Sequence, residues 1–243
     1  MALITIINAG KPFMDVETMP GVTRIRISAY NENHDELGRF SEGGGGIPES
    51  SKDVIKNNEG GQFIGDTQEK MLSYDSTNYG NNARFQEPVK EYQTRSEGLN
   101  NYLRGKEQSN FPQFYNKQAA GIDDIINKAP ALPEGLEMWR GLGEHSGETL
   151  AGKNIGDICE DKGFQSFSLN PQTADSFAQT WGDKGEVTMI RAITSGSEKG
   201  IYLSNRGEHE VIMPRGTAWK IVAKEDISAE GRGLYHVLTV MKS

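Results

Sequence analysis

The C-terminal half of the chain contains the stretch EHEVIMPRGT, residues Glu208–Thr217, which does most to decide the fold. Its apolar middle is β-prone, so we predict a strand over Glu208–Met213. Side chains two residues apart in a strand point to the same face, which would place Glu208 and Glu210 together and turn His209 away. Two adjacent carboxylates repel each other. The pair is therefore either solvated or a site for a cationic partner, a proton or a positively charged transition state.

The composition describes an acidic, loop-rich protein of one large domain, or of one domain with an appendage. The chain has 243 residues, 29 glycines and a net charge of -8, with a pI near 5.2 and a mean hydropathy of -0.62. An acidic surface repels phosphates, so we do not expect nucleic acid as a partner. The single cysteine, Cys159, excludes an intrachain disulfide and a thiolate metal site.

The N-terminus and the hydropathy pattern help to predict the compartment in which the protein acts. The apolar start, Met1–Asn8, is too short for a signal peptide, and no apolar run is long enough to predict a membrane span. Together with the lone cysteine, these features predict a protein that acts in a reducing cytoplasm. That compartment includes a host cytoplasm reached by injection or by secretion without a signal peptide. We expect a monomer.

Composition divides the chain into two parts. Residues 1–60 read as an N-terminal appendage with two short strands, Leu3–Ile7 and Val22–Ile27, and a Gly-rich linker at 41–48. Residues 61–243 read as the main domain.

Hydrophobic periodicity predicts the elements of the main domain and its class. The last strands lack helical crossovers, so we expect an α+β fold with mostly antiparallel strands rather than a doubly wound parallel sheet. Besides the strand named first, the pattern predicts helices over Pro88–Arg104, Ile122–Lys128 and Thr173–Thr180, and strands over Leu136–Arg140, Glu186–Ile193, Thr217–Ala223 and Leu234–Met241.

Two further segments carry polar groups at strand positions. One is Trp139–Gly141, where Arg140 ends a strand and its planar guanidinium can hold phosphate oxygens. The other reads GFQSFS, residues Gly163–Ser168. Ser166 and the second serine of that segment share a face, and their hydroxyls can bond to a carboxylate or to a sugar hydroxyl.

In this order the three segments resemble the arginine–serine–glutamate class of mono-ADP-ribosyltransferases, which includes clostridial toxins, vertebrate ecto-enzymes and phage-encoded enzymes. That family has an aromatic-Arg pair, a Ser-Thr-Ser strand preceded by Gly-Phe, and a Glu-x-Glu motif before a strand that ends in Pro-x-Gly-Thr. The likeness extends upstream to a helix with Tyr92 and the ending Leu99–Arg104, and it covers residues 85–240. One departure is Phe167, where the family usually has Thr.

The resemblance implies a fold and a reaction. The fold is the family's α+β core, two packed and mostly antiparallel small β-sheets with flanking helices, here over 61–243. The reaction is the NAD-dependent transfer of ADP-ribose to arginine side chains of a target protein, with release of nicotinamide. NAD is the substrate, and no metal takes part.

The resemblance also implies roles for the four residues expected to be catalytic. Arg140 would clamp the NAD phosphates. Glu210, held in place by Ser166, would bind the ribose and stabilise the positive charge that develops there. Glu208 would contact the incoming arginine, which is cationic and needs a proton acceptor.

Further NAD contacts are implied at four positions. Phe177 matches a family aromatic that stacks on nicotinamide, and Gly141 adjoins the phosphate clamp. Tyr92 and Asn101 would contact the adenine or its ribose. Core packing is the alternative for Phe177, and helix packing is the alternative for Tyr92 and Asn101.

Other functions remain open at this stage. An NAD glycohydrolase would use water in place of arginine, and a non-catalytic phage or effector protein would keep the fold for structure or binding. A nucleic-acid acceptor is a further alternative, against which the net charge argues. The four histidines are scattered and indicate no zinc site.

Overall fold

A computed structural model describes most of the main domain and three short stretches before it. The described residues are 4–5, 13–19, 22–28, 83, 86–106, 108–181, 186–203, 209–229 and 233–243. The Gly-rich linker predicted at 41–48, most of the N-terminal appendage and the predicted catalytic residue Glu208 lie outside them.

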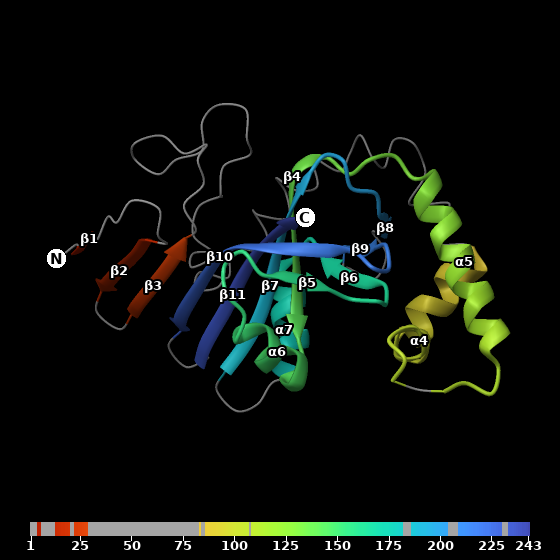
Figure 1. The fold of residues 1–243 in the computed structure, drawn as a ribbon, viewed down its shortest axis with the longest axis horizontal. Coiled ribbons are helices and arrows are strands. Elements are labelled where there is room, and N and C mark those ends of the chain that lie inside the picture. Colours follow the sequence, from red (N-terminus) through yellow and green to blue (C-terminus); the bar gives the residue numbers. More distant parts are fainter. Residues whose placement is uncertain are drawn as a thin grey trace.

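One continuous 11-stranded sheet runs through the described residues (Figure 1). Its order is β1-β2-β3-β10-β11-β7-β4-β6-β9-β8, with β5 paired to β10. The paired strands are antiparallel, except for the parallel pair of β7 and β11. The bounds are β1 (Ile4–Thr5), β2 (Phe13–Met19), β3 (Val22–Ser28), β4 (Glu134–Leu142), β5 (Ile158–Glu160), β6 (Gln165–Ser168), β7 (Glu186–Ser195), β8 (Ile201–Leu203), β9 (Glu210–Met213), β10 (Ala218–Ala229) and β11 (Gly233–Lys242).

The two small sheets expected from the sequence are present as two joined halves of this sheet. Within the described residues, β4 and β6 are joined at one register pair, Trp139 opposite Ser168. The two halves pack face to face on either side of this junction. One buried cluster shows it, since it contains Met138 from β4, Val211 from β9 and Leu238 from β11. Side chains from both halves interdigitate in this core, and the predicted α+β class is confirmed.

Helices cover the folded sheet in two places (Figure 1). Helices α4 and α5 share a buried cluster with Ile201 of β8 and Ile212 of β9. Helix α7 packs on β4 and β7, where Ala174 and Ala178 meet Trp139. The helices are α4 (Glu87–Leu103), α5 (Pro112–Lys128), α6 (Glu144–Ala151) and α7 (Pro171–Trp181).

The start of β9 corrects the first prediction made from the sequence. The strand begins at Glu210 rather than at Glu208. His209 has a φ of 47°, in the left-handed region, which a strand residue cannot adopt. His209, which the predicted strand included, therefore precedes β9, and Glu208 lies outside the described residues.

Two helical predictions also differ from the structure. Helix α4 matches the predicted helix, but its backbone is non-helical at Arg95. Helix α5 begins at Pro112 rather than at Ile122, because Tyr115 and Ala119 continue the apolar spacing of Ile122 toward the N-terminus, and proline suits a first helical turn. Helix α6 was not predicted, since Gly147 and its polar neighbours give no apolar pattern.

The N-terminal strands extend the main sheet. Strand β3 pairs with β10 in a register that sets Arg26 opposite Glu225, and β2 pairs with β3. The described part of the appendage is thus joined to the C-terminal strand β10 through β3. The boundary placed at residue 60 stays a prediction.

A histidine–aspartate pair bridges β10 and β11 and links stability to pH. His236 Nδ1 lies 2.7 Å from Asp226 Oδ1, and its Nε2 lies 3.8 Å from Glu186 Oε2. The hydrogen bond with Asp226 raises the pKa of His236 above its ordinary value. This stabilisation is complete below the pKa of an unfolded histidine, about 6.5, and disappears as the pH rises through the folded-state pKa. The same hydrogen bond lowers the pKa of Asp226, which therefore stays ionised in weak acid.

We expect the substitution His236→Gln to lower the free energy of unfolding more at about pH 5.5 than at about pH 9. The difference should be below about 1 kcal/mol, because Asp226 is partly exposed to solvent. Urea denaturation of both proteins at the two pH values measures it. An equal loss at both values would mean that packing, rather than charge, makes the contribution.

Candidate active site

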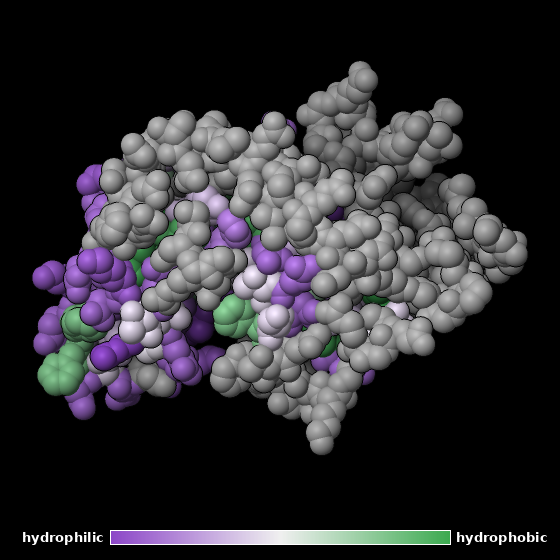
Figure 2. Space-filling model, turned by 180° about the vertical axis from the view of Figure 1, so that it is seen from behind, coloured by the Kyte–Doolittle hydropathy of each residue, from purple (hydrophilic) through white to green (hydrophobic). Residues whose placement is uncertain are grey.

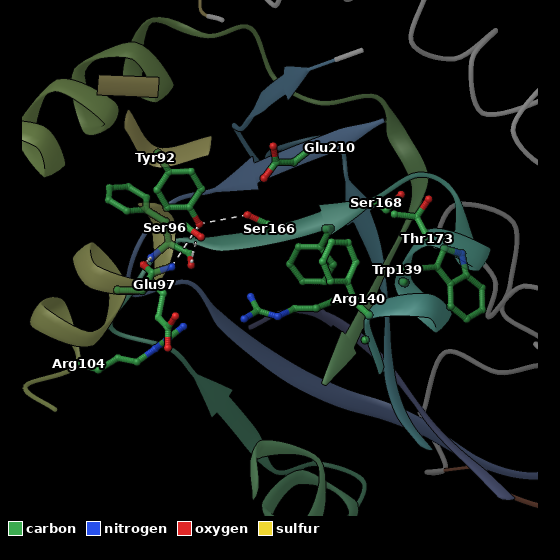
Figure 3. A pocket seen from close by; sticks show the side chains of 16 residues that line it. Tyr92, Ser96, Glu97, Arg104, Trp139, Arg140, Ser166, Ser168, Thr173 and Glu210 are labelled. Carbon is green, nitrogen blue, oxygen red and sulfur yellow. Dashed lines mark hydrogen bonds between the residues drawn. The ribbon is translucent and has the colours of Figure 1, made fainter. Parts of the chain in front are cut away.

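Side chains from distant parts of the sequence line one cavity of about 310 Å³ (Figure 3). It lies between helices α4 and α7 and strands β4, β6 and β9. Six of the predicted site residues line it, namely Tyr92, Arg140, Gly141, Ser166, Phe177 and Glu210. The structure thus brings together most of the residues selected from the sequence.

Arg140 projects from β4 into this cavity, toward Arg104 (Figure 3). Its Nη2 lies 3.9 Å from Asp161 Oδ2. Its Nη1 is buried and has no hydrogen-bond partner among the described residues. Burial lowers the pKa of Arg140, the charge of Asp161 opposes that shift, and the guanidinium stays charged. A buried charged donor without a protein partner indicates a place for a ligand's acceptor.

Arg104 is a second cation on the cavity wall, and the sequence did not select it. Its Nε and Nη2 donate to the two oxygens of Asp161 at 2.7 and 2.6 Å. Burial acts to raise the pKa of Asp161, but the hydrogen bonds from Arg104 and from the Gly163 amide outweigh it and hold that pKa below its usual range. The ionised Asp161 therefore orients two arginines toward the same space. What could have indicated Arg104 in the sequence is its position at the end of the helix that resembles the family's.

Helix α4 is fastened to β6 by hydrogen bonds around Tyr92. Tyr92 OH and Ser166 Oγ share a hydrogen bond of 3.1 Å, and Asn100 Nδ2 donates to Tyr92 OH at 3.3 Å. The Phe164 amide donates to Asn100 Oδ1 at 2.8 Å. Burial raises the pKa of Tyr92, so the phenol is neutral and can donate. Ser166 therefore contacts α4 through Tyr92, and its predicted role in holding Glu210 stays a prediction.

The sequence pointed to Asn101 as a ligand contact, and the structure places its neighbour Asn100 at the cavity. Asn100 lines the cavity, and Asn101 is not among its lining residues. Asn100 also bonds directly to Tyr92.

Glu210 is the first residue of β9 and lies across the cavity from Arg140 (Figure 3). Its carboxylate is half-buried and accepts a hydrogen bond from Gln93 Nε2 at 3.3 Å. In the β6–β9 register Glu210 lies opposite Ser168, so both side chains stand on the same face of the sheet as Ser166. His209 points elsewhere, with its Nδ1 2.9 Å from Tyr202 OH, as expected for a residue outside the reacting site.

Helix α7 closes the remaining side of the cavity. Phe177 is 51% exposed although it lines the cavity, which argues against the alternative that it packs in the core. Gly141 on β4 faces Ala174 and Ala178 of this helix, and its missing side chain permits their close approach. The role seen for Gly141 is therefore the packing of a cavity wall.

A second cavity of about 610 Å³ adjoins the first and shares Arg104 and Arg140 with it. Its wall includes Lys106, Lys153 and Lys162. The two arginines thus line both cavities, and positive side chains outnumber acidic ones around the second.

The described part of the chain shows neither a cluster of metal ligands nor a helix that could span a membrane. Its His, Cys, Asp and Glu side chains form no group of three that could hold a metal ion. No helix of the described ranges is long and apolar enough to cross a membrane. Cys159 is half-buried against the core, and burial raises the pKa of its thiol.

Comparison with known proteins identifies the family. Residues 65–241, well over half of the chain, match the ADP-ribosyltransferase exoenzyme family. The chain belongs to that family. The resemblance to the arginine–serine–glutamate class is confirmed, and this ADP-ribosyltransferase uses NAD as its substrate. Curated protein sequences give no match.

Solved structures show the same fold at low sequence identity. Plx2a, an ADP-ribosyltransferase toxin from Paenibacillus larvae, is similar at a TM-score of 0.53 and 14% identity, over 76% of this chain and 96% of that one. Vis toxin from Vibrio splendidus is similar at 0.50 and 17%, over 81% of this chain and 88% of that one. The same values of coverage and identity hold for Vis in complex with agmatine, at a TM-score of 0.51.

Proposed function

We propose that this ADP-ribosyltransferase transfers ADP-ribose from NAD to arginine side chains of a target protein and releases nicotinamide. The observation that carries the proposal is the convergence of Arg140, Ser166 and Glu210, from three different strands, on one cavity. Labelled NAD incubated with agmatine, a soluble guanidino compound, tests the proposal. Labelled ADP-ribosyl-agmatine is expected, whereas free ADP-ribose as the sole product with every acceptor would favour the NAD glycohydrolase.

The two arginines are suited to the pyrophosphate of NAD. Arg140 brings a buried Nη1 donor that has no partner within the described structure, and a phosphate oxygen would satisfy it. Arg104 stands on the same wall and is held in a fixed orientation by Asp161. A dianionic pyrophosphate between them would gain two charge-assisted contacts from donors that are already oriented.

Glu210 is suited to the charge that develops during the reaction. When the bond between ribose C1′ and the nicotinamide nitrogen breaks, nicotinamide leaves with the electron pair and positive charge spreads over C1′ and the ring oxygen. In the substrate this positive charge lies on the nicotinamide ring, so a carboxylate fixed beside the ribose stabilises the transition state more than the ground state. Ser166 and Ser168, on the same face of the sheet as Glu210, offer hydroxyls to the ribose.

Phe177 provides a surface for the leaving group. Its ring is half exposed on α7 at the edge of the cavity, beside Thr173, so a flat aromatic ligand can stack on it. Nicotinamide bound there would lie at the end of the cavity away from Arg104, which agrees with a dinucleotide lying across the site.

The choice of arginine as acceptor rests on two supports. Vis, which has the same fold, has been solved in complex with agmatine, a compound with the guanidinium group of arginine. The chain also carries Glu208 two residues before Glu210. In the proposed second step a guanidinium nitrogen attacks C1′, a nitrogen–carbon bond forms, and the proton lost from that nitrogen passes to the Glu208 carboxylate.

The substitution Glu208→Gln should separate the two steps. We expect transfer to agmatine to fall about 100-fold, because a general base is lost, while NAD cleavage by water changes less than about threefold. Both products can be measured by chromatography in the same reaction, so each preparation supplies its own control for folding and for NAD binding. An equal loss of both activities would refute the division of roles between Glu208 and Glu210.

A further inference from the structure

We propose that Gln93 is a positioning residue for the Glu210 carboxylate, an inference that rests on the proposed role of Glu210 in NAD cleavage. Gln93 Nε2 donates a hydrogen bond to Glu210 Oε2 at 3.3 Å, and this contact joins helix α4 to strand β9. The sequence suggested Ser166 for this task; the hydrogen bond that the structure shows to the Glu210 carboxylate comes from Gln93.

Gln93 is itself held on a fixed support. Its neighbour Tyr92 is 1% exposed, bonds to Ser166, and packs edge-on against Phe164 with ring centroids 5.9 Å apart. One turn earlier, Val89 is fully buried. The backbone of α4 leaves helical geometry only at Arg95, so Gln93 belongs to the regular part of the helix. A donor anchored in this way holds its partner more closely than a donor on a loop.

The backbone of Glu210 is fixed from the other side. The His209 carbonyl accepts a hydrogen bond from the Leu169 amide at 3.0 Å. The His209 ring stacks on Tyr202, whose hydroxyl lies 2.9 Å from Nδ1. These contacts set the direction in which Glu210 leaves the strand, and Gln93 then sets the direction of its carboxylate.

An amide is a suitable donor at this position. It stabilises the ionised carboxylate by hydrogen bonding and brings no positive charge, so the full negative charge remains available to the ribose cation. Among the described residues, the ionisable groups that line the cavity with Glu210 are Tyr92 and Glu97 from α4, Arg104 just after that helix, and Arg140 from β4, and His209 adjoins Glu210 in the chain. A lysine in place of Gln93 would form an ion pair with Glu210 and compete with the substrate.

The substitution Gln93→Met tests the hydrogen bond, because methionine keeps the length of the side chain and removes its donor. We expect kcat for nicotinamide release to fall about 10- to 100-fold, with KM for NAD unchanged within about threefold. Thr94→Val is the matched control, since Thr94 is exposed and bonds to the Lys90 carbonyl of its own helix. It should keep wild-type kcat.

The substitution Gln93→Glu gives a readout that a merely structural role would not move. A second carboxylate beside Glu210 opposes its ionisation, so the acidic limb of the kcat–pH profile should move to higher pH by about one unit. Wild-type kcat and an unmoved acidic limb in both variants, or a loss confined to KM, would overturn the proposal. Full NAD cleavage by a Glu210→Gln protein would refute the role of Glu210 separately, whatever the Gln93 variants do.

Discussion

Replacement of Glu210 by glutamine is expected to slow nicotinamide release from NAD by about 100- to 1,000-fold while leaving the fold intact. Glutamine offers a weak dipole to the developing ribose cation, where glutamate offers a full charge. It keeps the size of the side chain, and its carbonyl oxygen can still accept the hydrogen bond from Gln93. Nicotinamide release at saturating NAD measures the rate, and circular dichroism measures the fold.

Glu134→Gln is a suitable control for this experiment. Glu134 is an exposed carboxylate at the start of β4 and does not line either described cavity. Its loss should leave the rate unchanged. A Glu210→Gln protein that cleaves NAD at the wild-type rate would remove Glu210 from the mechanism, and one that also kept its full biological effect would favour the non-catalytic function considered from the sequence.

The core of the site was predictable because it depends on strands. Arg140, Ser166 and Glu210 lie on β4, β6 and β9, which are adjacent in the sheet. Alternation along a strand is set by backbone geometry, so the common face of Ser166 and Ser168 followed from their spacing. The family-like order of the three segments then predicted that they meet, and the structure places all three around one cavity.

The contacts between α4 and the sheet were not predictable in the same way. Which polar side chain reaches which partner depends on how the helix is set on the sheet, and on its irregular backbone at Arg95. Gln93 was therefore missed, and Asn101 was chosen where Asn100 lines the cavity. The late start of β9 was hidden as well, because the left-handed φ of His209 occurs at a residue that gives no glycine-like signal.

Helix α7, on the other side of the cavity, packs so closely on β4 that it limits which residue fits at position 141. Helix α7 presents Ala174 and Ala178, one turn apart, to Gly141 on β4. A Cβ on Gly141 would lie 2.6 Å from the Ala178 amide nitrogen and 2.8 Å from its Cβ, and would overlap the Ala174 carbonyl oxygen. Two of these three atoms belong to the backbone, so no change of rotamer can relieve the overlap.

We therefore expect Gly141→Ala to lower the free energy of unfolding by about 3 kcal/mol, the upper part of the usual range for overpacking, and to raise KM for NAD. Relief requires α7 to move away from β4, which carries Phe177 away from Arg140. Gly147→Ala is the matched control: its Cβ would come no closer than 3.1 Å to the Thr188 hydroxyl, and alanine favours helix α6, so its effect should stay within about 1 kcal/mol. Urea denaturation and NAD titration measure both variants. Equal free energies of unfolding for the two variants would mean that α7 does not pack on β4 as closely as the contacts of Gly141 indicate.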